Sequence, residues 1–67
     1  MKNPFKRFPD GTRAAYLGKV GTVISVKKAE ERGAIARKNA ATNRGILFDD
    51  GSVAIVHVNR LTEVAQQ

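Results

Sequence analysis

The chain has 67 residues, with twelve Lys and Arg against six Asp and Glu, and a formal net charge of +6 at pH 7. That length holds one domain with a thin core, and the positive balance favours polyanions or an acidic protein surface as partners. The absence of Cys and the single His exclude disulfides and argue against a zinc site, so oligomerisation is the open route to extra stability.

The compartment is predicted from two absences. No apolar run approaches the roughly 20 residues of a membrane helix. The basic N-terminus is not followed by the apolar stretch of a secretory signal. We therefore expect a cytoplasmic protein.

Residues 1–10 predict an extended basic arm, because Pro4 and Pro9 disfavour helix. Its run Phe5-Lys6-Arg7-Phe8 interleaves aromatic and basic side chains. Such an arm can stack on bases and contact phosphates. The alternative is that one phenylalanine plugs the open end of a small barrel while the charges stay in water.

Two strands are predicted next. The first covers residues 12–16, after a turn at Pro9-Asp10-Gly11. The second covers residues 19–27 and is expected to bend at Gly21, since an interior glycine often marks a bulge or a barrel corner. On this second strand Val23 faces one side, opposite to Val20, Thr22, Ile24 and Val26.

The run Tyr16-Leu17-Gly18-Lys19-Val20-Gly21-Thr22-Val23-Ile24-Ser25-Val26 resembles the KOW motif of ribosomal proteins and of transcription elongation factors such as NusG. In that family a Gly-Lys-x-Gly-x-Val pattern opens the second strand of an SH3-like barrel. The resemblance implies that fold, and it implies an association with RNA or with a nucleoprotein machine.

A long basic insert follows, at about residues 28–43. Its many Ala, Glu, Lys and Arg residues favour helix, whereas Gly33 costs about 1 kcal/mol relative to Ala. Because Ile35 is its only large apolar residue, we predict either a mobile or a partly helical segment. It is either a basic finger for nucleic acid or an acidic protein, or a solvated loop.

A β-hairpin is predicted over residues 44–58, with a two-residue type I′ turn at Asp50-Gly51. That turn would pair Phe48 with Val53 and Ile46 with Ile55. One face would then carry Ile46, Phe48, Val53, Ile55 and His57, while Leu47, Asp49, Ser52, Ala54, Val56 and Val58 would lie on the other.

The C-terminal part completes the expected barrel. Asn59-Arg60-Leu61 fits a single 3₁₀ turn that places Leu61 in the core, and Thr62 to Val64 fits a short last strand. Residues 65–67 are a frayed tail. The predicted fold is all-β, a five-stranded SH3-like barrel over residues 11–64, carrying the insert.

The preferred functional hypothesis is a non-enzymatic binding module for nucleic acid, without sequence-specific readout, because no known type of recognition helix is visible. Binding should weaken with salt as counterions are released. Tyr16, Phe5 or Phe8 would stack on bases. The expected contact residues are Lys6, Arg7, Tyr16, Lys19, Lys27, Lys28, Arg32, Arg37, Lys38 and Arg44.

The alternative is a protein-interaction regulator of RNA polymerase or of another nucleic-acid enzyme. Small basic proteins of phages and mobile elements are similar to this chain in size and charge. The basic insert would meet an acidic surface of the partner, and Leu47, Val56 and Val58 would form the apolar centre of the contact.

A third, remote hypothesis is an enzyme. The segment from Gly51 to Leu61 is similar to the closing strand of plasmid-borne, trimethoprim-insensitive dihydrofolate reductases, which are SH3-like homo-oligomers. Their Val-Gln-Ile-Tyr tetrad is Val53-Ala54-Ile55-Val56 here, without the Gln and Tyr that contact ligands. His57 has no visible nucleophile partner. We therefore expect no catalysis and no cofactor, with homo-oligomerisation left open.

Overall fold

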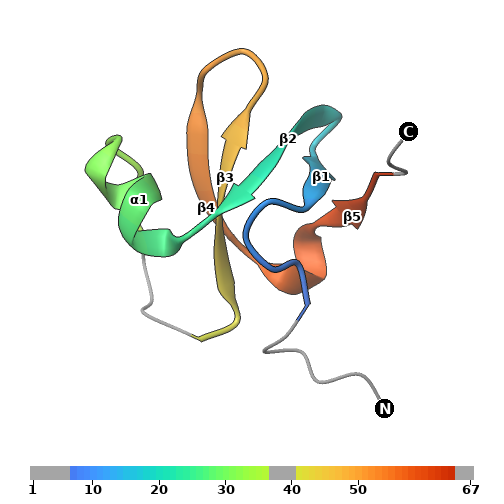
Figure 1. Cartoon of the computed structure of the whole chain (residues 1–67), viewed down its shortest axis with the longest axis horizontal. Helices are drawn as coiled ribbons and strands as arrows, with labels where there is room; N and C mark the ends of the chain where they lie inside the picture. Colours follow the sequence, from blue (N-terminus) through green and yellow to red (C-terminus); the bar gives the residue numbers. More distant parts are fainter. Residues whose placement is uncertain (1–6, 37–40, 65–67) are drawn as a thin grey trace.

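The computed structural model describes residues 7–36 and 41–64. Five strands form one antiparallel sheet in the order β4-β3-β2-β1-β5 (Figure 1). The prediction of a small, mostly β fold with five strands is thereby confirmed. The elements are β1 (Arg13–Tyr16), β2 (Lys19–Ile24), α1 (Val26–Glu31), β3 (Asn43–Phe48), β4 (Val53–His57), the 3₁₀ helix η2 (Val58–Arg60) and β5 (Thr62–Glu63).

A two-residue turn closes the β1–β2 hairpin, whereas the sequence predicted such a turn at Asp50-Gly51. Tyr16 pairs with Lys19, and the loop between them is Leu17-Gly18, with φ of 52° and 80°. Positive φ at both central residues matches a type I′ turn, which suits the right-handed twist of the strands. Leu17 holds this strained conformation while 82% of its surface is exposed.

The β3–β4 hairpin is confirmed, but its predicted turn is wrong. Leu47 pairs with Val53, and the loop is one residue longer than expected. The Phe48 N–H donates to the Ser52 carbonyl at 2.8 Å, and the Gly51 N–H donates to the Phe48 carbonyl at 2.9 Å. Gly51, at φ 93°, takes the left-handed position of a three-residue loop with a bulge. The Asp50 carboxylate fixes this loop by accepting the Ser52 N–H at 2.9 Å.

The longer loop shifts the register of β4 by one residue, and this moves every β4 side chain to the opposite face. Ile46 therefore pairs with Ala54 instead of Ile55. Val56 and Val58, which were expected on the face opposite to Ile46, are 8% and 0% exposed. They belong to the core, whereas Val53 and Ile55 lie half-buried on the other face.

The buried hydrophobic residues of the described ranges form one core on one face of the sheet. Phe8, one of the two phenylalanines considered as a plug, is 4% exposed and belongs to this core, so its ring is not available for stacking on bases. Val23 is a core residue, and Leu61 lies in the core directly after η2, as the C-terminal pattern predicted. The core consists of Phe8, Ala14, Val23, Ile46, Phe48, Val56, Val58 and Leu61.

Helix α1 begins earlier than the predicted insert and replaces the end of the predicted second strand. Ser25 caps it, because its hydroxyl accepts the Lys28 N–H at 3.1 Å. Ala29 is fully buried, and a Cβ on Gly45 would lie only 2.8 Å from the Ala29 Cβ. Gly45 therefore lets α1 pack closely against β3 on the face opposite to the core.

The sheet is not closed by hydrogen bonds within the described residues, and β4 and β5 are its edges. In an antiparallel pair, alternate residues direct their backbone groups toward the partner strand. The hydrogen bond between Phe48 and Ser52 sets this alternation. The N–H and C=O groups of Val53, Ile55 and His57 consequently point away from β3, toward the open edge.

Candidate nucleic-acid interface

Two basic residues near the tip of the β3–β4 hairpin are neutralised by carboxylates. The Arg13 guanidinium donates two hydrogen bonds to Asp49, at 2.6 and 2.9 Å, and a third to the Thr22 hydroxyl at 2.9 Å. Lys19 Nζ lies 2.9 Å from the Asp50 carboxylate and 4.6 Å from the centre of the Phe48 ring. We call these contacts the hairpin-tip ion pairs. Lys19, a predicted contact residue, is therefore occupied within the protein.

The hairpin-tip ion pairs also shift the titration of their members. Hydrogen bonds from Arg13 lower the pKa of Asp49, and that of Arg13 is raised by the same contact. Hydrogen bonds from the Ser52 hydroxyl, the Ser52 N–H and Lys19 hold the pKa of Asp50 well below its ordinary value. Both carboxylates therefore stay charged at neutral pH and offset the two cations.

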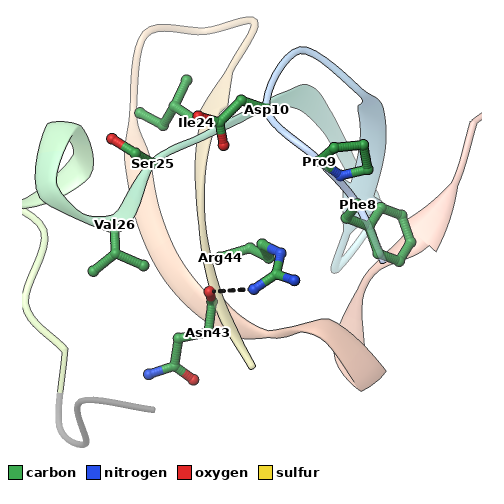
Figure 2. Close-up of a pocket in the computed structure, with 8 residues that line it drawn as sticks. All are labelled: Phe8, Pro9, Asp10, Ile24, Ser25, Val26, Asn43 and Arg44. Atoms are coloured by element: carbon green, nitrogen blue, oxygen red, sulfur yellow. Dashed lines mark hydrogen bonds between the residues drawn. The ribbon is translucent and has the colours of Figure 1, made fainter. Parts of the chain in front are cut away.

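Arg44 is a structural residue. Its Nε donates to the Arg7 carbonyl at 2.9 Å, and its Nη1 donates to the carbonyls of Ala41 and Asn43 at 2.8 and 2.9 Å. It thereby ties the N-terminal segment to the start of β3. Figure 2 shows its side chain reaching across a small depression of about 270 Å³, between Asn43 and the Phe8-Pro9 segment.

Arg7 is likewise engaged, since its guanidinium donates to the Asn59 side chain at 3.3 Å and lies 5.4 Å from the centre of the Phe8 ring. The sequence predicted both Arg7 and Arg44 as phosphate contacts. The hydrogen bonds of Arg44 give it a structural role. Arg7 instead forms one long hydrogen bond at the surface.

Helix α1 and the residue after it present the predicted basic side chains that are exposed. Lys27, Lys28 and Arg32 are exposed and form no ion pair with a carboxylate of the described residues. Glu30 and Glu31 lie among them, so the helix is of mixed charge with a basic excess. Of the remaining predicted residues, Lys6, Arg37 and Lys38 lie outside the described ranges.

A second, larger depression of about 540 Å³ lies beside the open edge of β4, and we call it the edge groove. Tyr16 from β1 lines it together with Ile55 and His57 from β4, although two strands separate β1 and β4 in the sheet order. The sheet therefore curves enough to bring these strands to one site. Arg60, at the end of η2, and Asn43 add polar side chains, and Ile35 and Ala36 add apolar ones.

His57 has a defined tautomer in the edge groove. Its Nδ1 accepts the Asn59 N–H at 3.1 Å, which also caps η2. In the neutral ring the proton must then reside on Nε2, which is a hydrogen-bond donor. The groove therefore combines an aromatic ring, an Arg, a His donor and an amide, with no carboxylate among its lining residues.

Of the seven predicted contact residues that the structure describes, only Tyr16 lines the edge groove, and Lys27, Lys28 and Arg32 cluster at α1. The sequence did not identify Arg60, Asn43 and His57 as residues that share a groove with Tyr16. In the sequence Arg60 belongs to the predicted 3₁₀ turn, and its charge is the one signal that points to it. The grouping itself depends on how the sheet curves, which no local pattern reveals.

The helices within the described ranges are too short and too polar to cross a membrane. Comparisons of the chain with protein-family models, with curated proteins and with solved structures find no match.

Proposed function

We propose that this protein is a small, non-enzymatic binding module that associates with nucleic acid through phosphate contacts, without reading a specific sequence. The proposed compartment is the cytoplasm, which the absence of Cys fits. The proposed architecture is an SH3-like barrel in which η2 joins β4 to β5 across the open side. The KOW-like run from Tyr16 to Val26 supports the same assignment by resemblance.

The observation that carries the proposal is the distribution of the positive charges. All six acidic residues lie within the described ranges, and two of them are used by Arg13 and Lys19. Lys27, Lys28, Arg32 and Arg60 are exposed without an ion pair to any described carboxylate. Exposed cations that lack internal partners attract phosphates and release counterions when they bind.

The test is a fluorescence anisotropy titration of labelled single-stranded RNA, duplex RNA and duplex DNA at low and moderate salt. We expect binding that weakens steeply with salt. We also expect it to weaken by at least tenfold at low salt in a variant with Lys27→Gln, Lys28→Gln and Arg32→Gln. Absence of binding by the wild-type protein at low salt would contradict the proposal.

A matched control removes acidic charge from the same helix. The Glu30→Gln, Glu31→Gln variant changes two exposed side chains of α1 and makes the protein more basic. It should bind the same probes more tightly than the wild-type protein. Equal weakening in both α1 variants would show that the helix, and not its charge, is what matters.

The second candidate is a protein-interaction regulator, and two exposed apolar side chains favour it. Leu17 and Ile35 are 82% and 85% exposed. The sequence predicted Leu47, Val56 and Val58 as the apolar centre of the contact with a partner. Val56 and Val58 are buried in the core and cannot serve it. The half-buried apolar residues on the face opposite to the core are instead Val20, Ile24, Leu47, Val53 and Ile55.

An affinity capture experiment separates the two candidates. Wild-type protein and a Leu17→Asn, Ile35→Ser variant would each be immobilised and exposed to lysate with and without nuclease treatment. A nucleic-acid enzyme retained by the wild-type protein alone would favour the regulator. Capture that nuclease treatment abolishes would favour direct nucleic-acid binding.

A further inference from the structure

We propose that the edge groove holds one unpaired nucleotide of a single-stranded nucleic acid, with its base on Tyr16 and its phosphate at Arg60. This inference rests on the proposed function and deepens it, because it selects single strands over duplexes. It also assigns a binding role to His57 and Arg60, which the sequence did not identify.

The ring of Tyr16 supplies the stacking surface. Tyr16 is half-buried and packs against the core cluster on one side, while it also lines the edge groove. One side of the residue is thus held in place and another is open. Stacking of a base on a fixed aromatic ring tolerates every base, because each base has a π face. Ile35, which is 85% exposed beside the same groove, adds apolar surface that a base can cover.

The open edge of β4 supplies hydrogen bonds for the edge of the base. The backbone N–H and C=O groups of Ile55 and His57 point away from β3, and both residues line the groove. A neighbouring N–H donor and C=O acceptor match the donor and acceptor pattern on the Watson–Crick edge of a base. In a duplex those base groups are already paired, so only an unpaired base can use this strand edge.

The charged and polar side chains of the groove suit a phosphate. Arg60 is exposed and its guanidinium has no ion pair with a described carboxylate. His57 donates from Nε2 when its ring is neutral. None of the described residues that line the groove carries a carboxylate, which favours an anion there. An apolar peptide could also pair with the β4 edge, but it would leave the cation of Arg60 without a partner.

The experiment measures binding of a labelled single-stranded RNA dodecamer and of its duplex. The variants are Tyr16→Leu, which keeps the apolar packing but loses the ring, and Arg60→Gln. Tyr16→Phe keeps the ring, and Arg13→Gln removes an equal charge at the hairpin tip. Circular dichroism melting confirms that each variant is folded.

We expect Tyr16→Leu to weaken single-strand binding about tenfold. Arg60→Gln should weaken it several-fold, whereas Tyr16→Phe and Arg13→Gln should match the wild-type protein. Duplex binding should change little in Tyr16→Leu. If Tyr16→Leu and Arg60→Gln bind single strands as the wild-type protein does, the groove is not a nucleotide site and a peptide partner becomes its best occupant.

A second readout keeps this inference separable from the proposed function. Amide chemical shifts in ¹⁵N-labelled protein would be followed while an oligouridine hexamer is added. We expect shifts at Ile55, His57 and Tyr16. Shifts confined to Lys27, Lys28 and Arg32 would overturn the groove assignment while supporting nucleic-acid binding, and no shifts together with no anisotropy change would overturn both.

Discussion

The hairpin tip and the edge groove use the same kind of side chain in opposite ways. At the hairpin tip, Arg13 and Lys19 each meet an aspartate within 2.9 Å. At the groove, Arg60 is exposed and meets no described carboxylate. The difference lies in the neighbours, because the turn that closes β3–β4 itself contains the two aspartates. Net charge therefore predicts a polyanion partner, but the local carboxylates decide which cations can serve it.

Removing the two aspartates at the hairpin tip would leave its cations without ion-pair partners among the described residues, as Arg60 already is at the edge groove. In an Asp49→Asn, Asp50→Asn variant, Arg13 and Lys19 would lose their partners and add two exposed cations. Affinity for nucleic acid at low salt should rise about tenfold, and the salt dependence should steepen by roughly one unit per new phosphate contact. Anisotropy measured over a salt series gives both values.

The control for that variant changes the same number of charges elsewhere. Asp10 and Glu63 are exposed and form no ion pair with the described basic residues. The Asp10→Asn, Glu63→Gln variant should raise affinity by less, with the wild-type salt slope. Equal gains in both variants would mean that total charge alone governs binding.

Displacing α1 tests how closely this helix packs on β3, away from the hairpin tip. Gly45→Ala places a methyl group 2.8 Å from both the Ala29 Cβ and the Ser25 carbonyl oxygen. The helix must shift, and overpacking of this kind costs about 1–3 kcal/mol of the free energy of unfolding. Urea denaturation measures that loss. A fully stable Gly45→Ala variant would contradict the close packing of α1 on β3.

Relieving backbone strain at the β1–β2 turn should raise the free energy of unfolding, by less than Gly45→Ala lowers it. Leu17→Asn replaces an exposed residue at φ 52° by one that tolerates this conformation. We expect a gain of about 0.5–1 kcal/mol in the free energy of unfolding, with unchanged nucleic-acid binding. If affinity for nucleic acid falls as stability rises, Leu17 belongs to the binding surface.

Acid should lower only modestly the stability that the hairpin-tip ion pairs contribute. The pKa values of Asp49 and Asp50 are lowered in the folded protein, so their contribution is fully present above the ordinary carboxyl pKa of about 4. It is lost as the pH falls through their folded pKa values. The melting temperature should therefore drop below about pH 4, and the Asp49→Asn, Asp50→Asn variant should show a shallower drop.

Local patterns were sufficient for the existence of the five strands, for the 3₁₀ turn and for the buried Leu61, although the second strand ends at Ile24 and not at the predicted residue 27. They failed at the β3–β4 loop because Asp50 uses its carboxylate to hold Ser52, which favours a three-residue loop over the two-residue turn. The extra loop residue shifts the register of β4 by one and exchanges its two faces. The predicted face of Val56 and Val58 was therefore wrong.

Most of the candidate site was less predictable than the fold. Arg44 looks like any other exposed cation in sequence, yet it binds the carbonyl of a residue 37 positions away. Residues of β1, β4 and η2 line the edge groove together because the sheet curves. The exposed cations of α1 were predictable because a short helix with a polar face leaves them in solvent.

The most direct test of this account is the slope of log affinity against log salt concentration for wild-type protein on single-stranded RNA. With at least three phosphate contacts, from Lys27, Lys28 and Arg32, the account predicts a linear fall with a slope of about −2 or steeper. A slope near zero, or no binding at low salt, would contradict the claim that the exposed cations of this protein bind phosphates.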